Sequence, residues 1–67
     1  MEMQIRMLND DYNLCLELYR QGYETKEATI KQYRKYANDI RTIFITNKEF
    51  EKHYEINLKR LKELEWT

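Results

Sequence analysis

The sequence predicts a single all-α domain, a small three-helix bundle that forms a homodimer. One observation is that its 67 residues include one Gly and no Pro, too few turn formers for a β-sandwich or barrel. Another is that apolar residues recur at spacings of three and four behind helix-capping residues. Charged residues make up 36% and apolar residues 42%, which is typical of a globular rather than a disordered chain. We expect helices at about 10–21, 25–45 and 47–65, after a leader at 1–8.

The first helix has a start signal in Asn9 or Asp10, either of which can act as its N-cap. Gly22 is placed to take the left-handed conformation that ends a helix, and Tyr23 would then fold back onto Leu18. The leader alternates apolar and polar residues as far as Met7. It has two alternative structures: an extended segment that pairs with a second subunit, or an early turn of the first helix.

The second helix is predicted to begin after Thr25 as its N-cap. Residues 42–46 are β-branched and aromatic and would favour a strand. Helical spacing sustained over four turns outweighs that short run, so we expect a helix with a frayed end. Its apolar stripe, which Tyr36 and Ile43 widen, consists of Ile30, Tyr33, Ala37, Ile40 and Phe44.

The third helix carries a capping box, with Thr46 as N-cap and Glu49 three residues later. Ile45 and Phe50 supply the matching hydrophobic staple. Asn57 falls inside the apolar stripe of this helix. A polar residue there either fixes register or oligomeric state, or lies at the edge of the stripe in contact with water.

Self-association is expected because the predicted core is small and nothing else reinforces it. Cys15 has no second cysteine with which to form a disulfide. Ile56 and Trp66 fall outside the apolar stripe of the third helix. We therefore predict Ile56 and Trp66, together with Asn57, as protein-interface residues.

Several chemistries are excluded by composition. The chain has no serine nucleophile, and one Cys and one His cannot form a four-ligand zinc site. Gly22 alone cannot form a phosphate-binding loop. Leu14 and Leu16 flank Cys15, and its nearby charges are acidic, so a buried, unreactive thiol is expected. We predict a non-catalytic protein without metal or cofactor. The absence of an apolar run of ~18 residues predicts a cytoplasmic protein that does not enter membranes.

Charge is unevenly distributed along the chain. Residues 1–24 carry two basic and five acidic groups, whereas 25–46 carry five basic and two acidic groups. The basic groups are interleaved with tyrosines, a pattern that can bind phosphates and stack on bases. The alternative is that the acidic first helix lies antiparallel to the second and neutralises it. The candidate nucleic-acid contacts are Lys31, Arg34, Lys35 and Arg41.

One stretch resembles a known family. Residues 18–28, LYRQGYETKEA, resemble the opening of a helix-turn-helix, and residues 36–37, 44–47, Phe50 and Tyr54 resemble the later part of the same pattern. The chain is similar here to the N-terminal DNA-binding domain of phage terminase small subunits. The resemblance implies DNA binding, but this chain departs from the family at 31–35, where KQYRK replaces the Gly-Tyr-Ser type turn that precedes a recognition helix.

These observations predict a small helical adaptor or regulator that acts by protein–protein interaction, with itself and/or another protein as partner. Its size suggests a phage or other mobile element. The alternative is a DNA-binding protein of the helix-turn-helix type. A second alternative is an inhibitor that presents an acidic surface to a nucleic-acid enzyme, through Glu2, Asp10, Asp11, Glu17 and Glu24.

Overall fold

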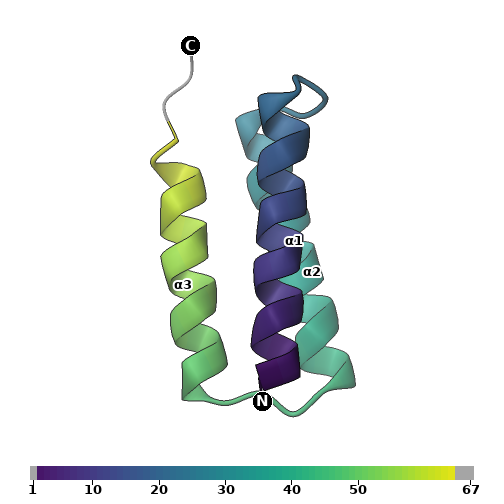
Figure 1. Cartoon of the computed structure of the whole chain (residues 1–67), viewed down its shortest axis with the longest axis vertical. Coiled ribbons are helices and arrows are strands. Elements are labelled where there is room, and N and C mark those ends of the chain that lie inside the picture. Colours follow the sequence, from purple (N-terminus) through teal and green to yellow (C-terminus); the bar gives the residue numbers. More distant parts are fainter. Residues whose placement is uncertain (1, 65–67) are drawn as a thin grey trace.

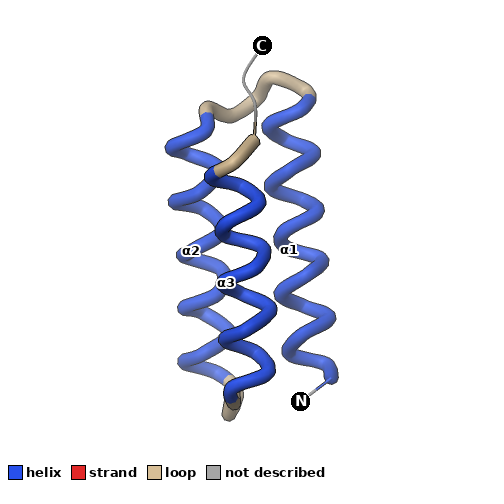
Figure 2. Tube along the Cα trace, turned by 90° about the vertical axis from the view of Figure 1, so that its left-hand side faces the viewer, coloured by secondary structure: helices blue, strands red, loops and turns tan. Residues whose placement is uncertain are grey.

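The computed structural model describes residues 2–64 and contains three helices in the order α1 (Glu2–Arg20), α2 (Lys26–Ile43) and α3 (Lys48–Lys62). Each helix contacts both others. The chain runs up, down and up, so that α1 and α3 are parallel and α2 is antiparallel to both (Figure 1). The second view shows the same three helices side by side (Figure 2). The predicted three-helix bundle is thus confirmed, with principal extents of 37 × 18 × 15 Å.

The leader forms the first turns of α1, which resolves the two alternatives in favour of a helix. The helix begins at Glu2, so the prediction that Asn9 or Asp10 caps it is wrong. Both residues lie inside α1, because the apolar residues of the leader continue the buried stripe. Leu8 is fully buried and Met7 packs against the core. Burial along one helix face outweighs the short alternating pattern.

The turn between α1 and α2 is formed as the sequence predicts. Gly22 has φ +83°, the Tyr23 amide donates to Leu18 O, and the Gly22 amide donates to Tyr19 O. This pair of bonds defines a Schellman motif, which satisfies carbonyls that the helix end leaves free. Only the backbone of Tyr23 folds back onto Leu18, because the Tyr23 side chain is 72% exposed to solvent.

The predicted cap of α2 is confirmed, whereas that of α3 is shifted by one residue. The Thr25 side chain accepts from the Ala28 amide at 3.2 Å. In α3 the N-cap is Asn47, whose Oδ1 accepts from the Phe50 amide at 3.2 Å. The capping box on Thr46 and Glu49 is therefore wrong, because Asn is at least as good an N-cap and sits in reach of that amide.

The ends of α2 and α3 also fall short of the expected bounds. Helix α2 ends at Ile43, with Phe44 extended at φ −121° and ψ 153°, rather than at 45. The predicted staple is absent because Ile45 is 88% exposed while Phe50 is fully buried. Helix α3 ends at Lys62, before the expected position 65, and the end of that prediction lies outside the described residues.

The core is a single cluster at the centre of the bundle. Tyr33 is fully buried. Its ring packs edge-on against the ring of Tyr12, with 6.0 Å between the centroids, and stacks on the ring of Tyr54, with 5.6 Å between the centroids. One tyrosine from each helix thus forms a continuous aromatic row. The buried apolar residues are Leu8, Cys15, Tyr33, Ala37, Ile40, Phe50 and Leu61.

Candidate interaction surfaces

The two predicted interface residues that the structure describes lie together beside a groove between α1 and α3. Ile56 is 42% exposed, as its position outside the apolar stripe predicts. Asn57 is only 5% exposed. The groove has a volume of about 450 Å³, and we call it the α1/α3 groove. Its lining consists of Asn9, Tyr12, Asn13, His53, Ile56, Asn57 and Arg60.

Asn57 belongs to the interior of the chain, which excludes the alternative of an edge position in contact with water, while its assignment as an interface residue stays a prediction. Its Nδ2 donates to Asn9 Oδ1 at 2.8 Å and to Tyr33 Oη at 3.0 Å. These three residues come from α1, α2 and α3. Burial raises the pKa of the Tyr33 hydroxyl, so the phenol stays protonated. Asn57 is therefore a link between the three helices.

Trp66, the other predicted interface residue, lies outside the described residues.

The four predicted nucleic-acid contacts fall into two groups. Lys31, Arg34 and Lys35 are exposed along one face of α2, which we call the basic face. None of them forms an ion pair within residues 2–64. Glu27 and Asp39 border the same surface hollow, so the positive charge is confined to about one helical turn.

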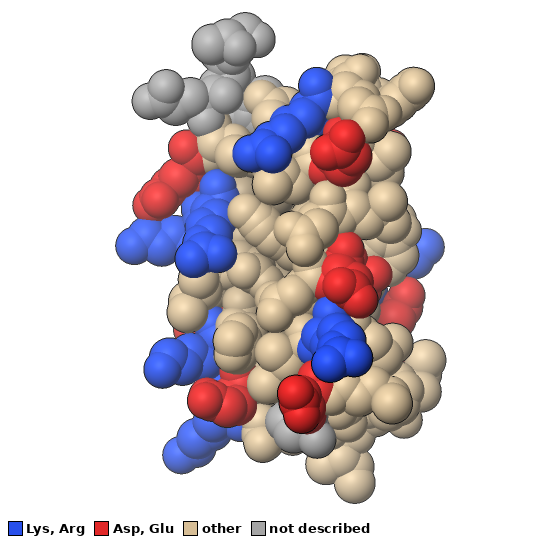
Figure 3. All heavy atoms as spheres, viewed as in Figure 1, with Lys and Arg blue, Asp and Glu red and all other residues tan. Residues whose placement is uncertain are grey.

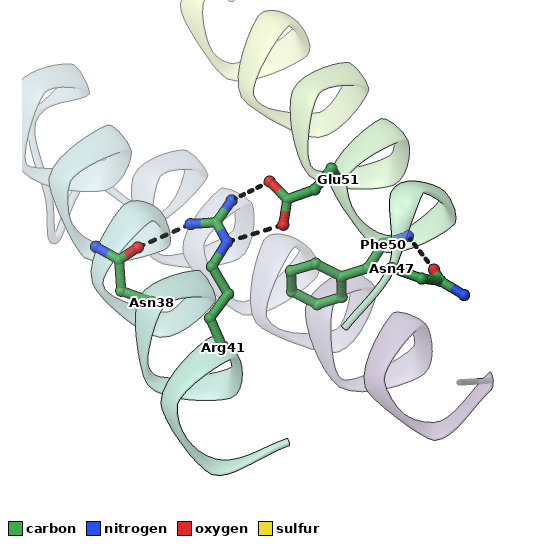
Figure 4. A network of polar contacts seen from close by, with 5 residues as sticks. All are labelled: Asn38, Arg41, Asn47, Phe50 and Glu51. Carbon is green, nitrogen blue, oxygen red and sulfur yellow. Dashed lines mark hydrogen bonds and ion pairs between the residues drawn. The ribbon is translucent and has the colours of Figure 1, made fainter. Parts of the chain in front are cut away.

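Arg41 is separated from this face by its contacts with α3, while its assignment as a nucleic-acid contact stays a prediction. Its Nε and Nη2 donate to the two carboxylate oxygens of Glu51 at 2.9 and 2.6 Å, and Nη1 donates to Asn38 Oδ1 at 2.7 Å (Figure 4). The guanidinium also lies 4.5 Å from the centroid of the Tyr54 ring. The hydrogen bonds to Glu51 raise the pKa of Arg41. Each of its three nitrogens thus donates to a side chain of this protein.

Four of the five residues of the proposed acidic surface are exposed, including Glu24 in the connection between α1 and α2. Glu2, Asp10 and Glu17 are exposed on α1, whereas Asp11 is half-buried and faces α2. Burial, with the charges of Asp10 and Asp39, raises the pKa of Asp11. Asp11 therefore does not extend one continuous acidic surface.

Three large apolar side chains at one end of the bundle were not predicted as a site. Met3 is 65%, Ile43 71% and Ile45 88% exposed. The Gln4 Nε2 donates to Ile45 O at 3.4 Å, which brings the start of α1 to the α2–α3 connection. We call these three residues the apolar end. Isolated exposed apolar residues are ordinary, but three at the same end of a small bundle are a candidate interaction surface.

Cys15 is 1% exposed, and its thiol pKa is raised to about 11 by burial and by the charges of Asp11 and Glu24. The thiol is therefore protonated near neutral pH, as expected for an unreactive core cysteine. Among residues 2–64, no group of three or more His, Cys, Asp or Glu side chains could hold a metal ion. No helix in this part of the chain is long and apolar enough to cross a membrane.

Comparison of the chain with known protein families, with curated proteins and with solved structures finds no match.

Proposed function

We propose that this chain is a non-catalytic adaptor or regulator that binds another protein through its apolar end. The observation that carries this proposal is the exposure of Ile43 and Ile45, at 71% and 88%, at the end of the bundle where α1 begins and Met3 is 65% exposed. Covering such side chains on binding removes apolar surface from water, which stabilises a complex by ~25 cal/mol per Å². The extended backbone at Phe44 presents the two isoleucines at the tip of the bundle.

The test replaces the apolar end without touching the core. The double variant Ile43→Lys/Ile45→Lys should keep its helical circular dichroism, because both side chains are exposed. Proteins captured by the wild type from a lysate of its own cell should be lost by this variant. The captured partner, once purified, should bind the variant at least about tenfold more weakly, because apolar contacts at the centre of an interface dominate its affinity.

Leu14→Lys is the matched control, since Leu14 is also a large apolar residue, 47% exposed, but lies in the middle of α1. It should bind the purified partner as the wild type does. If the apolar-end variant and the control bind the partner equally well, the proposal is wrong.

DNA binding through the basic face remains a second proposal, because Lys31, Arg34 and Lys35 are exposed and without ion pairs within residues 2–64. Helix α2 is unbroken from Lys26 to Ile43, so residues 31–35 do not begin a separate recognition helix. Three cations can neutralise at most about three phosphates, which limits the slope of log K against log salt to about −3.

Fluorescence anisotropy with a labelled DNA duplex between about 50 and 200 mM salt tests this second proposal. Binding should be weak, fall with that slope, and be lost in Lys31→Glu/Lys35→Glu but not in Lys62→Glu. Absence of binding at the lowest salt concentration, or equal loss in the Lys62 control, would exclude the basic face as the contact.

A further inference from the structure

The α1/α3 groove lies between two parallel helices of opposite net charge. Helix α1 contains four acidic and two basic residues, and α3 contains five basic and three acidic residues. One of the acidic residues of α3, Glu51, is already paired with Arg41. Figure 3 shows an uncharged strip between α3 and α1, with charged side chains on both sides of it. Ile56 contributes exposed apolar surface at the groove.

We propose that this groove binds the same groove of a second copy of the chain, with a two-fold axis parallel to the helices. Rotation about such an axis exchanges the two sides of the face, so that α1 of each copy lies against α3 of the other. The net negative charge of α1 then meets the net positive charge of α3 twice.

The charge distribution excludes the other two-fold arrangement of this face. An axis perpendicular to the helices would place α1 against α1 and α3 against α3, with like net charges opposed at both contacts. Like charges opposed across an interface cost several kcal/mol, whereas complementary potentials fix the register of the partners. The basic face of α2 cannot supply a symmetric interface either, because its three unpaired cations would meet their own copies.

The available surface suffices for such a dimer. A face of the bundle measures up to 37 × 18 Å in projection, comparable with the ~800 Å² that each partner buries in a standard interface. Ile56 is the apolar anchor of the contact. Around it the groove offers amide, imidazole and guanidinium groups that can hydrogen-bond across the interface or through water.

One specific charge pair follows from this geometry. The hydrogen bond from Asn57 Nδ2 to Asn9 Oδ1 fixes the relative height of α1 and α3. Asp10 follows Asn9, and Arg60 lies three residues after Asn57, within about one helical turn. A two-fold axis parallel to the helices keeps these heights unchanged, so Asp10 of one copy faces Arg60 of the other at each side of the groove.

Sedimentation equilibrium over a range of protein concentrations tests the dimer. The wild type should associate as a dimer with a dissociation constant of about 10–100 µM, and Ile56→Glu should weaken association at least about tenfold. Ile43→Glu is the control, since Ile43 is an exposed apolar residue at the end of α2 that does not line the groove, and it should associate as the wild type does. A monomeric wild type up to about 1 mM, or equal weakening by both variants, would overturn the proposal.

Charge exchange tests the direction of the axis. Asp10→Lys and Arg60→Glu should each weaken the dimer about threefold to tenfold, and the double variant should recover most of that loss, because the pair is restored with its signs reversed. A double variant that dimerises no better than the weaker single variant would contradict the arrangement. Circular dichroism confirms that each variant is folded.

Partner binding through the apolar end and dimerisation through the α1/α3 groove use different surfaces, so each proposal can be contradicted independently of the other. Ile43→Lys/Ile45→Lys should leave the dimer intact while it weakens partner binding, and Ile56→Glu should weaken the dimer while it leaves partner binding intact. Loss of the dimer in the apolar-end variant would show that the second copy binds there and would overturn the groove proposal.

Discussion

Asp11 carries a charge in an environment that disfavours it. The residue is half-buried on α1, and its pKa is raised by burial and by the carboxylates of Asp10 and Asp39. A carboxyl group with a raised pKa binds its proton more tightly in the folded state than in the unfolded chain. Its favourable contribution to folding is therefore complete below the ordinary value of 3.8 and is lost as pH rises through the folded value.

We expect Asp11→Asn to raise the free energy of unfolding at pH 7 by about 0.5 kcal/mol, a modest gain because water still screens the group. The gain should disappear at pH values below 3.8, where Asp11 itself is protonated. Urea unfolding of both proteins at pH 3 and pH 7 measures the difference. Glu55→Gln, which removes an exposed carboxylate from α3, is the control for the loss of a surface charge. A gain of equal size at both pH values would contradict this account.

Arg41 and Ile43 illustrate which site residues the sequence could not place. Arg41 looks like part of a basic patch in the sequence, yet its partner Glu51 lies on another helix and becomes adjacent only in the fold. Ile43 fits the helical spacing of α2 but is the last residue of that helix and is exposed. Ile56 was placed correctly on the surface because its position outside the stripe of α3 depends on local geometry alone.

At the scale of the helices, the sequence predicts a helix boundary correctly where a single residue can act as the cap. It predicts the boundary wrongly where two candidate caps are adjacent. Gly22 and Thr25 are the only residues of their kind at the first connection, and both act as predicted. At the second connection Thr46 and Asn47 are adjacent cap formers, and the capping-box spacing to Glu49 favours Thr46. The structure selects Asn47, since its side chain reaches the Phe50 amide.

The cap provides a direct test of this choice. Asn47→Ala should lower the free energy of unfolding by about 1 kcal/mol, because the Phe50 amide loses its acceptor. For a domain of this size that corresponds to a fall in Tm of roughly 4–8 °C. Thr46→Ala, one residue earlier, should change stability by less than about 0.5 kcal/mol. Thermal unfolding followed by circular dichroism compares the two, and a larger loss for Thr46→Ala would restore the capping box.

At the scale of the whole molecule, one polar network holds the three helices at defined heights. Asn57 of α3 is within hydrogen-bond distance of Asn9 on α1 and Tyr33 on α2, and it is 5% exposed. Apolar contacts tolerate sliding of one helix along another, whereas a buried amide that loses its partners incurs the full cost of desolvation. The sequence placed Asn57 in the stripe but could not identify its partners, which lie 48 and 24 residues away.

This network should appear as a coupling between substitutions. Tyr33→Phe removes one acceptor of the Asn57 amide and should cost about 1 kcal/mol, and Asn57→Leu should cost about 1–3 kcal/mol because it leaves the Tyr33 hydroxyl unsatisfied. In the double variant that hydroxyl is also absent. The free energy of unfolding that the double variant loses should therefore be smaller, by about 1 kcal/mol, than the sum of the losses of the two single variants.

Tyr36→Phe combined with Asn57→Leu is the matched control, since Tyr36 is on the same helix but the Asn57 amide donates to Asn9 and Tyr33 instead. Its losses should add within about 0.5 kcal/mol. Equilibrium unfolding in urea gives all the values required. If the Tyr33 and Tyr36 cycles gave the same coupling, the hydrogen bond would not be the origin of the effect. The helices would then be held in register by the aromatic row of Tyr12, Tyr33 and Tyr54.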